Sequence, residues 1–139
     1  MLEPSDSQEC KDFAKAAFQL SEEYDTPVLV RLSTRVSHSQ SLVELEERQE
    51  LPLKEYKKDI AKNVMMPAMA IKRHVVVEER IRKLTALAET TELNKIEDNG
   101  AEIGIITGGI AYQYAKEALG DQVNYLKLGM VYPISPKLL

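Results

Sequence analysis

Two short apolar runs, joined by a glycine pair and a helical stretch, constrain the fold of this chain most strongly. Residues 103–107 form a near-continuous apolar run, and residues 124–128 form a second strand-like run. Between them, Gly108-Gly109 indicates a turn, and residues 110–119 have a helical pattern that Gly120 ends. A strand, a helix and a strand in this order predict a right-handed βαβ unit with parallel strands. The apolar first run is typical of a strand buried on both faces of such a sheet.

A helix followed by a strand is predicted at the N-terminal end. Ser5 and Gln8 have the spacing of a capping box, and Thr26-Pro27 ends the helical pattern. Residues 28–32 are rich in β-branched side chains and are too short for a helix, so they predict a strand. The stripe that the helix is expected to bury is made of apolar residues at helical spacing: Cys10, Phe13, Ala14, Ala17, Leu20 and Tyr24.

The middle of the chain is dominated by a stretch without glycine or proline. After Pro67, which suits the first turn of a helix, residues 68–92 predict one long helix of about 20 to 25 residues. Before it the pattern is weak: residues 51–53 predict a loop, and residues 54–62 a turn or two of helix. The long helix is expected to connect domains, with an apolar ladder of Ala70, His74, Val77, Ile81, Leu84 and Leu87.

Composition excludes several classes of protein. The net charge is -4, and no dense Lys/Arg cluster is present, which argues against binding to nucleic acid. No apolar run approaches the ~20 residues that span a bilayer. The polar, acidic N-terminus does not resemble a secretory signal, so a cytoplasmic location is expected. Cys10 is the only cysteine and cannot by itself form a disulfide, a zinc site or an iron–sulfur cluster; we expect a buried, inert thiol.

Two polar motifs are candidates for binding. Residues 34–39 combine Arg35, whose guanidinium matches a carboxylate, with His38, which can move protons near pH 7. They are expected at the C-terminal end of the strand at residues 28–32, where open parallel sheets bind ligands, and the alternative is a solvated loop. Gly108-Gly109 at a helix N-terminus can hold an anion, or it can simply permit a tight turn.

These motifs resemble a known family. Residues 4–9, 26–31 and 34–39 look like the end of the pyrimidine-binding domain in large (alpha) subunits of indolepyruvate:ferredoxin oxidoreductases, which belong to the 2-oxoacid:ferredoxin oxidoreductases. Residues 64–68 and 73–80 resemble that family's linker. Residues 104–112 and 126–133 resemble the start of a domain like the C-terminal domain of transketolase.

The resemblance implies an α/β fold made of partial parallel-sheet units. Residues 1–45 would be the C-terminal part of the thiamine-diphosphate pyrimidine-binding domain. Residues 46–98 would be a linker with the long helix, and residues 99–139 the start of the transketolase C-terminal-like domain. The chain is thus expected to be an internal fragment of the large subunit that straddles two domains.

The resemblance also implies an activity for the intact enzyme, which oxidatively decarboxylates aryl pyruvates such as indolepyruvate to aryl-acetyl-CoA with ferredoxin as acceptor. Its cofactors are thiamine diphosphate, Mg²⁺ and 4Fe-4S clusters, and its partners are the remainder of the large subunit, the small (beta) subunit and ferredoxin. Because the motifs that hold these cofactors find no match here, we expect no cofactor in this chain and no activity from it alone. The candidate contacts with the active site or a domain interface are Thr34, Arg35, Ser37 and His38. The alternative is a non-enzymatic module that forms a homodimer through the long helix.

Overall fold

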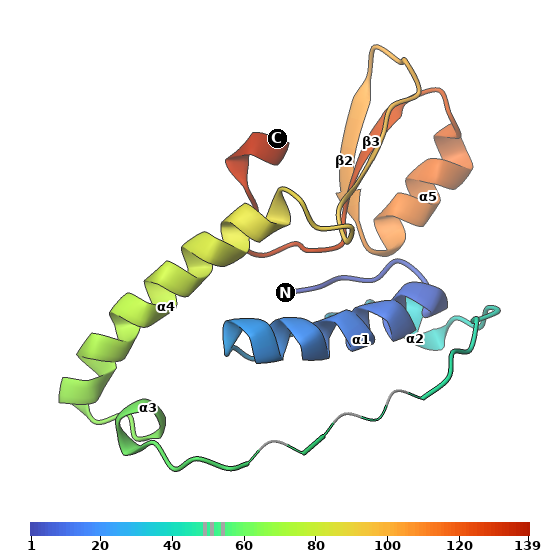
Figure 1. Cartoon of the computed structure of the whole chain (residues 1–139). Coiled ribbons are helices and arrows are strands. Elements are labelled where there is room, and N and C mark those ends of the chain that lie inside the picture. Colours follow the sequence, from blue (N-terminus) through green and yellow to red (C-terminus); the bar gives the residue numbers. More distant parts are fainter. Residues whose placement is uncertain (49, 51, 54) are drawn as a thin grey trace.

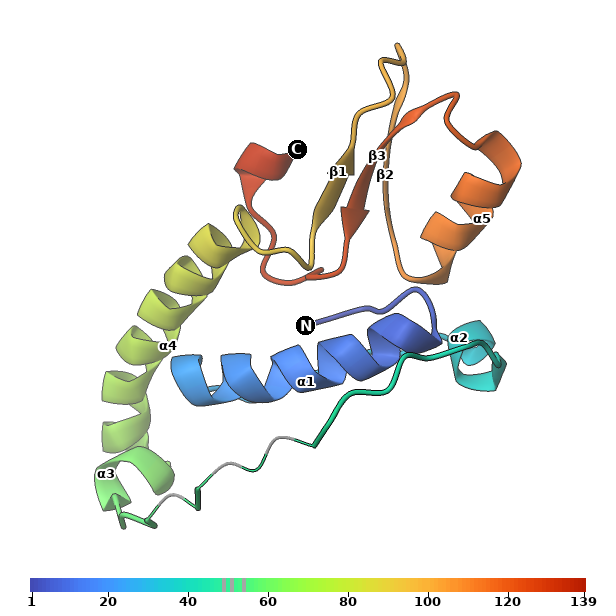
Figure 2. The same ribbon diagram turned by 45° about the vertical axis from the view of Figure 1, so that its right-hand side comes forward.

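A computed structural model describes residues 1–48, 50, 52–53 and 55–139, and it is a mixed α/β structure with a small mixed sheet, as expected (Figure 1). Both views place α1 below the sheet, while α4 runs from α3 towards the sheet (Figures 1 and 2). In chain order the elements are α1 (Ser7–Tyr24), α2 (Thr34–His38), α3 (Ile60–Asn63), α4 (Pro67–Ala88), β1 (Lys95–Glu97), β2 (Gly104–Gly108), α5 (Ile110–Leu119), β3 (Asn124–Leu128) and the 3-10 helix η1 (Pro136–Leu138).

The predicted βαβ unit is confirmed. β2 and β3 are parallel, with Ile105 opposite Tyr125, and α5 connects them over its predicted length. The sheet order is β1-β3-β2, and β1 pairs with β3 in the antiparallel direction. The sequence did not predict β1, because three residues are too few to show an alternating pattern.

Helix α1 begins differently from the prediction. Its N-cap is Asp6, whose carboxylate accepts a hydrogen bond from the Glu9 N–H at 2.8 Å. The expected capping box of Ser5 and Gln8 is therefore wrong, because Ser5 is fully buried and donates its hydroxyl and its N–H to the Glu9 carboxylate. The helix ends at Asp25, which takes the left-handed conformation with φ 51°.

The predicted strand at residues 28–32 is wrong in extent, since only Val30 forms an isolated bridge. Its partner is the N-terminal segment: Leu2 donates its N–H to Leu29, and Arg31 donates to Leu2, each at 2.8 Å. Leu2 also forms an antiparallel bridge with Met130. The N-terminal residues thus lie between the two α/β pieces and hydrogen-bond to both, and a segment of about three residues is too short to support a full strand beside it.

The long helix is confirmed, with Pro67 at its first turn, although it ends at Ala88 and not near residue 92. Asn94 accounts for the early end, because its side-chain amide donates to the Ala88 carbonyl at 2.9 Å. The same side chain accepts hydrogen bonds from the N–H groups of Gly129 and Met130. Asn94 therefore joins the end of α4 to the chain that follows β3. Among the described residues, no helix is both long and apolar enough to cross a membrane.

The stretch between α2 and α4 has little regular structure. The helical turn expected in residues 54–62 appears only at its end, as α3, while Leu51 and Lys54 of the expected loop and turn lie outside the described residues. Residues 44–46 lie beside α1, where the Glu44 N–H donates to the side-chain oxygen of Gln8 at 2.7 Å and Lys15 pairs with Glu46 at 2.6 Å.

One hydrophobic cluster combines residues from both ends of the chain with residues from α4. Its buried members are Leu2 from the N-terminal segment, Phe13 from α1, Ala88 from α4 and Met130 after β3. Leu84, from the ladder of α4, packs against the cluster as well. Residues from all three expected domain segments thus share a core. The partly buried residues around it are Ala17, Leu20, Val28, Val30, Leu84, Leu93 and Leu138.

Candidate functional site

The four residues expected to contact an active site lie on or at the exposed side of α2. Thr34, Arg35, Ser37 and His38 are all exposed, and only Val36 between them is buried. The stretch is therefore a short helix, capped by Ser33, whereas the sequence analysis expects it at the C-terminal end of a strand, with a solvated loop as the alternative. Within the described part of the chain, the side chains of Arg35 and His38 have no hydrogen-bond or ion-pair partner.

Figures 1 and 2 place α2 beside the N-terminal end of α1. A buried polar network begins at the same end of α1. Lys127 of β3 donates to Glu9 of α1 at 2.5 Å, and both residues are buried. The other Glu9 oxygen accepts from the N–H and the hydroxyl of Ser5 at 3.0 and 2.9 Å. Gln113 of α5 donates to Ser5 and to Asp6. This network, here called the Glu9 network, ties α1 to the sheet and to α5.

Burial alone would raise the pKa of Glu9. The hydrogen bond from Lys127 and those from Ser5 together outweigh burial, so the pKa of Glu9 stays below its ordinary value of 4.5. The Lys127 ammonium also lies 4.4 Å from the centre of the Tyr112 ring, a cation–π contact. Both charges are thus compensated by neighbours, as buried charges must be.

A second polar group lies next to the Glu9 network, on the face of the sheet that α5 covers. Glu97 of β1 accepts hydrogen bonds from Tyr112 and, at 2.7 Å, from Lys116 of α5. Burial and the hydrogen bond to Glu97 raise the pKa of Tyr112 to about 12. The Tyr112 hydroxyl therefore remains a hydrogen-bond donor at neutral pH and is a poor candidate for proton transfer.

The glycine turn before α5, a candidate anion site, already faces a carboxylate. A Cβ atom at Gly109 would lie 2.8 Å from Oε1 of Glu3, so the Glu3 side chain occupies the space beside the turn. Arg31 pairs with the same carboxylate at 2.6 Å. A phosphate at this turn would have to displace Glu3 or bind beside its negative charge, so this arrangement favours the alternative of a simple turn.

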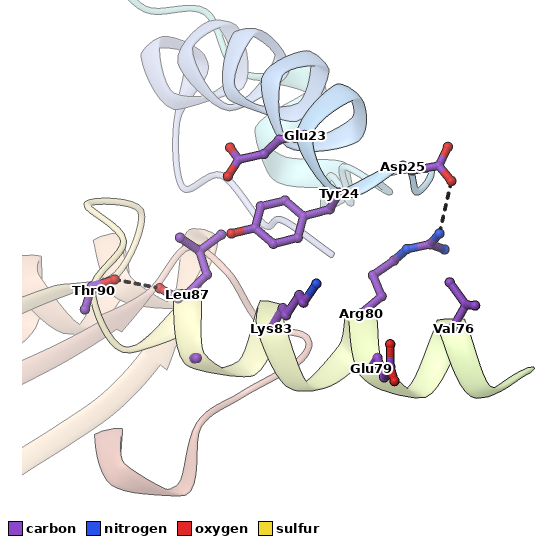
Figure 3. A pocket seen from close by; sticks show the side chains of 10 residues that line it. Glu23, Tyr24, Asp25, Val76, Glu79, Arg80, Lys83, Leu87 and Thr90 are labelled. Atoms are coloured by element: carbon purple, nitrogen blue, oxygen red, sulfur yellow. Dashed lines mark hydrogen bonds and ion pairs between the residues drawn. The ribbon is translucent and has the colours of Figure 1, made fainter.

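An open cleft of about 760 Å³ lies between the C-terminal end of α1 and α4, and Figure 3 shows Tyr24 reaching across it towards Leu87. Arg80 on the floor of the cleft pairs with Asp25 at 3.2 Å. Lys62 and Arg73 also pair with Asp25, and the hydrogen bond from Lys62 is the main cause that lowers the pKa of this carboxyl. The lining contains neither histidine nor cysteine and provides no nucleophile with an adjacent base.

The donor groups in this structure do not fit the metal centres that the resemblance implies. Within residues 1–48, 50, 52–53 and 55–139, no three His, Cys, Asp or Glu side chains gather as a metal site would require. Cys10 is partly exposed and not buried as expected; burial is the main cause that raises the pKa of its thiol, followed by the nearby charges of Asp6 and Glu9. A single thiol cannot replace the four cysteines of a cluster.

Sequence reasoning missed the Glu9 network, although two signals for it were present. Lys127 interrupts the otherwise uncharged β3 run, and Glu9 lies four residues before Phe13 on the buried stripe of α1. A charge at a position that should be buried indicates a buried partner. The identity of that partner, 118 residues away, depends on the tertiary fold.

Comparison with known proteins agrees with the resemblance. The family model described as pyruvate flavodoxin/ferredoxin oxidoreductase, thiamine-diphosphate-binding, matches residues 1–105. The indolepyruvate oxidoreductase subunit IorA of Methanothermobacter marburgensis is 42% identical over 96% of this chain, and this match covers 22% of the relative. The IorA subunits of Pyrococcus horikoshii and Archaeoglobus fulgidus are 40% and 33% identical over the whole chain, which covers 23% of each. The chain therefore spans less than a quarter of the length of these curated relatives. No solved structure gives a significant match.

Proposed function

Because the chain belongs to the pyruvate flavodoxin/ferredoxin oxidoreductase, thiamine-diphosphate-binding family, we propose that it is a structural segment of the large subunit of an indolepyruvate-type 2-oxoacid:ferredoxin oxidoreductase. One observation carries this proposal: the match to the M. marburgensis subunit extends over 96% of the chain, from the N-terminal segment to the βαβ unit.

The activity that we propose for the intact enzyme is the oxidative decarboxylation of an aryl pyruvate such as indolepyruvate to an aryl-acetyl-CoA, with ferredoxin as electron acceptor. Thiamine diphosphate, Mg²⁺ and 4Fe-4S clusters would supply the decarboxylation and electron-transfer chemistry, and they would be held outside this segment. The proposed partners are the remainder of the large subunit, the small subunit and ferredoxin. The names of the relatives, which are subunits, support an assembly of this kind.

Within the enzyme, the segment would hold parts of two domains at a fixed distance. The Glu9 network joins α1 to β3, and the N-terminal bridges of Leu2 join the segment at Val30 to the one at Met130. We propose residues 1–45 and 99–139 as parts of two neighbouring domains, with residues 46–98 between them, and these contacts would hold the two parts together.

We assign Arg35 and His38 to contacts outside the segment, because both are exposed and lack partners within the described residues. In the intact subunit, Arg35→Ala should lower kcat/KM by about tenfold, as for the loss of one charge-assisted hydrogen bond, while the thermal midpoint stays unchanged. Equal kcat/KM in the variant and the parent would refute this role.

The chain alone should bind no cofactor. Titration of thiamine diphosphate with Mg²⁺ into the purified chain, followed by calorimetry, should give only heats of dilution, with the intact subunit as the positive control. A saturable isotherm with micromolar affinity would contradict the proposal, because it would place the cofactor site within these residues.

The alternative of a module that dimerises through the long helix is less well supported. The ladder residues Val77, Ile81 and Leu84 line a cleft of about 220 Å³ against the N-terminal segment and the end of α1. Contacts within the chain thus already cover part of these three side chains. Sedimentation at high concentration tests the alternative: a dimer that Val77→Lys dissociates would favour it.

A further inference from the structure

The side of α4 that lies towards α1 changes in character along the helix. Near the C-terminal end it is apolar: Ala88 belongs to the buried cluster, and Leu84 packs against that cluster. Farther from the core, the same side carries Arg73 and Arg80, which are half-buried and lie seven residues apart on one face of the helix. Helix α4 is therefore anchored by apolar packing at its C-terminal end and presents basic groups to α1 farther along.

One carboxylate at the end of α1 pairs with both arginines. An oxygen of Asp25 accepts a hydrogen bond from Arg80 at 3.2 Å, and the guanidinium of Arg73 lies 3.8 Å from the same oxygen. The other Asp25 oxygen accepts a hydrogen bond from Lys62 of α3. Three cations from the two helices that follow thus converge on a single side chain, and Figure 2 shows the end of α1 meeting the middle of α4.

The backbone holds Asp25 in a defined place. The residue is the C-cap of α1 in the left-handed conformation, and its N–H donates to the Ser21 carbonyl. The next residue, Thr26, donates its N–H to the same carbonyl at 3.2 Å. Aspartate and asparagine are among the few residues other than glycine that take this conformation readily. The carboxylate is therefore a fixed point to which the cations of α3 and α4 attach.

Packing between α1 and α4 is incomplete at this point. The open cleft of about 760 Å³ and the smaller cleft of about 220 Å³ both lie along the boundary, and Arg80 lines both of them (Figure 3). Protein interiors normally contain few voids larger than a water molecule, and atoms that line a void lose their dispersion contacts. The ion pairs of Asp25 therefore cross a boundary that apolar packing does not close.

We propose that Asp25, Lys62, Arg73 and Arg80 form an electrostatic latch, which holds α3 and the N-terminal half of α4 against the end of α1. When the latch opens, α4 pivots about its C-terminal end, where Ala88 stays in the buried cluster. The latch responds to ionic strength, because its side chains are between 14% and 51% exposed and salt screens exposed pairs. This inference goes beyond the proposed function, since it gives the helix of the linker two positions.

The distance between two spin labels tests the latch. Cys10 is replaced by serine, and labels are attached through Phe18→Cys on α1 and Val75→Cys on α4, at positions that are 76% and 60% exposed. At low salt this labelled parent should show one narrow distribution of distances. Asp25→Asn removes the charge but suits the left-handed position, so the helix end should be kept, and a second population at longer distance should appear. Arg80→Gln should give a smaller second population, because two of the three ion pairs remain.

Salt provides a measurement that needs no change at the latch. In the labelled parent, a rise from 0.1 M to 1 M NaCl shortens the screening length from about 10 Å to about 3 Å, so the same longer distance should appear. Glu46→Gln is the matched control, since Glu46 is 54% exposed and pairs with Lys15 of α1, and it should leave the distribution unchanged.

A distribution that neither Asp25→Asn nor 1 M salt alters would overturn the proposal. An equal response to Asp25→Asn and Glu46→Gln would overturn it too, because the effect would then follow from the loss of any surface charge. These distances are measured without cofactor and without other subunits. Their outcome is therefore independent of the experiments that test the proposed function.

Discussion

Lys127 and Glu9 are two opposite charges removed from water, with side chains that are 5% and 12% exposed. Their removal from water is costly, and the attraction between them offsets the cost only when the remaining hydrogen-bonding capacity is satisfied. Ser5 provides this on the Glu9 side, and the ring of Tyr112 faces the ammonium of Lys127. The main role of the pair is therefore to fix the position of α1 against the sheet, and its net contribution to stability is small.

Removal of one member of the Glu9–Lys127 pair should lower the free energy of unfolding. Lys127→Met keeps most of the side-chain volume but leaves a buried carboxylate without its cation, so we expect a loss of about 3 to 5 kcal/mol in the free energy of unfolding, measured in urea. Lys137→Met is the control, since Lys137 is 79% exposed and pairs with Glu89 at the surface, and it should change little. Similar effects of the two variants would contradict the structural role of the Glu9–Lys127 pair.

The same pair predicts a dependence on pH. Because the folded-state pKa of Glu9 lies below its ordinary value of 4.5, its stabilising contribution is present above that pH and disappears as the pH falls through the folded-state pKa. In urea unfolding between pH 7 and pH 3, the parent should have a higher free energy of unfolding than Glu9→Gln at neutral pH. This difference should disappear as the pH falls below about 4.5. A difference between the two proteins that stays constant over this range would count against the prediction.

The connections between elements depend on close backbone contacts after β3. Gly129 donates its N–H to the Leu93 carbonyl at 3.1 Å, and Asn94 accepts from Gly129 and from Met130. A Cβ atom at Gly129 would lie 2.2 Å from the Leu93 carbonyl oxygen and 2.6 Å from the Phe13 ring. The end of α4, the end of β3 and the buried stripe of α1 thus meet at one glycine.

Gly129→Ala should therefore destabilise the fold by about 3 kcal/mol or more, because a backbone carbonyl and a core ring must both move. The control is Gly104→Ala, where the added Cβ would meet nothing within 4 Å, and its effect should stay within about 1 kcal/mol. The measurement is again the free energy of unfolding. Failure of Gly129→Ala alone to give folded protein would agree with the prediction, whereas equal stability of both variants would refute it.

Elements with long repeating patterns could be predicted from the sequence, and short ones could not. α4 and α5 were predicted because ten or more residues display their period or carry clear end signals. α2 has five residues and β1 has three, and the bridges of Leu2 involve single residues. These elements form through tertiary contacts, which leave no periodic signal in the sequence.

At the scale of the whole molecule, the N-terminal segment decides how the parts fit together. The sequence predicted two α/β pieces and a helical connector; α4 and the C-terminal βαβ unit appear, whereas the N-terminal strand is reduced to a single bridge at Val30. What it could not predict is that Leu2 would lie between Val30 and Met130 and enter the same cluster as Phe13 and Ala88. The candidate residues of α2 were identified by residue type, but their exposure and the absence of partners among the described residues come from the structure.

We propose that this chain is equivalent to the corresponding segment of an indolepyruvate oxidoreductase large subunit. Replacement of the matched region of the M. marburgensis IorA subunit by this chain tests it most directly, with assembly on the small subunit and indolepyruvate-dependent reduction of ferredoxin as the readouts. The unmodified subunit is the control. We expect the chimera to assemble and to keep activity within about tenfold of the control, about 1.4 kcal/mol in the barrier. A chimera that folds and binds thiamine diphosphate but neither assembles nor turns over would contradict this equivalence.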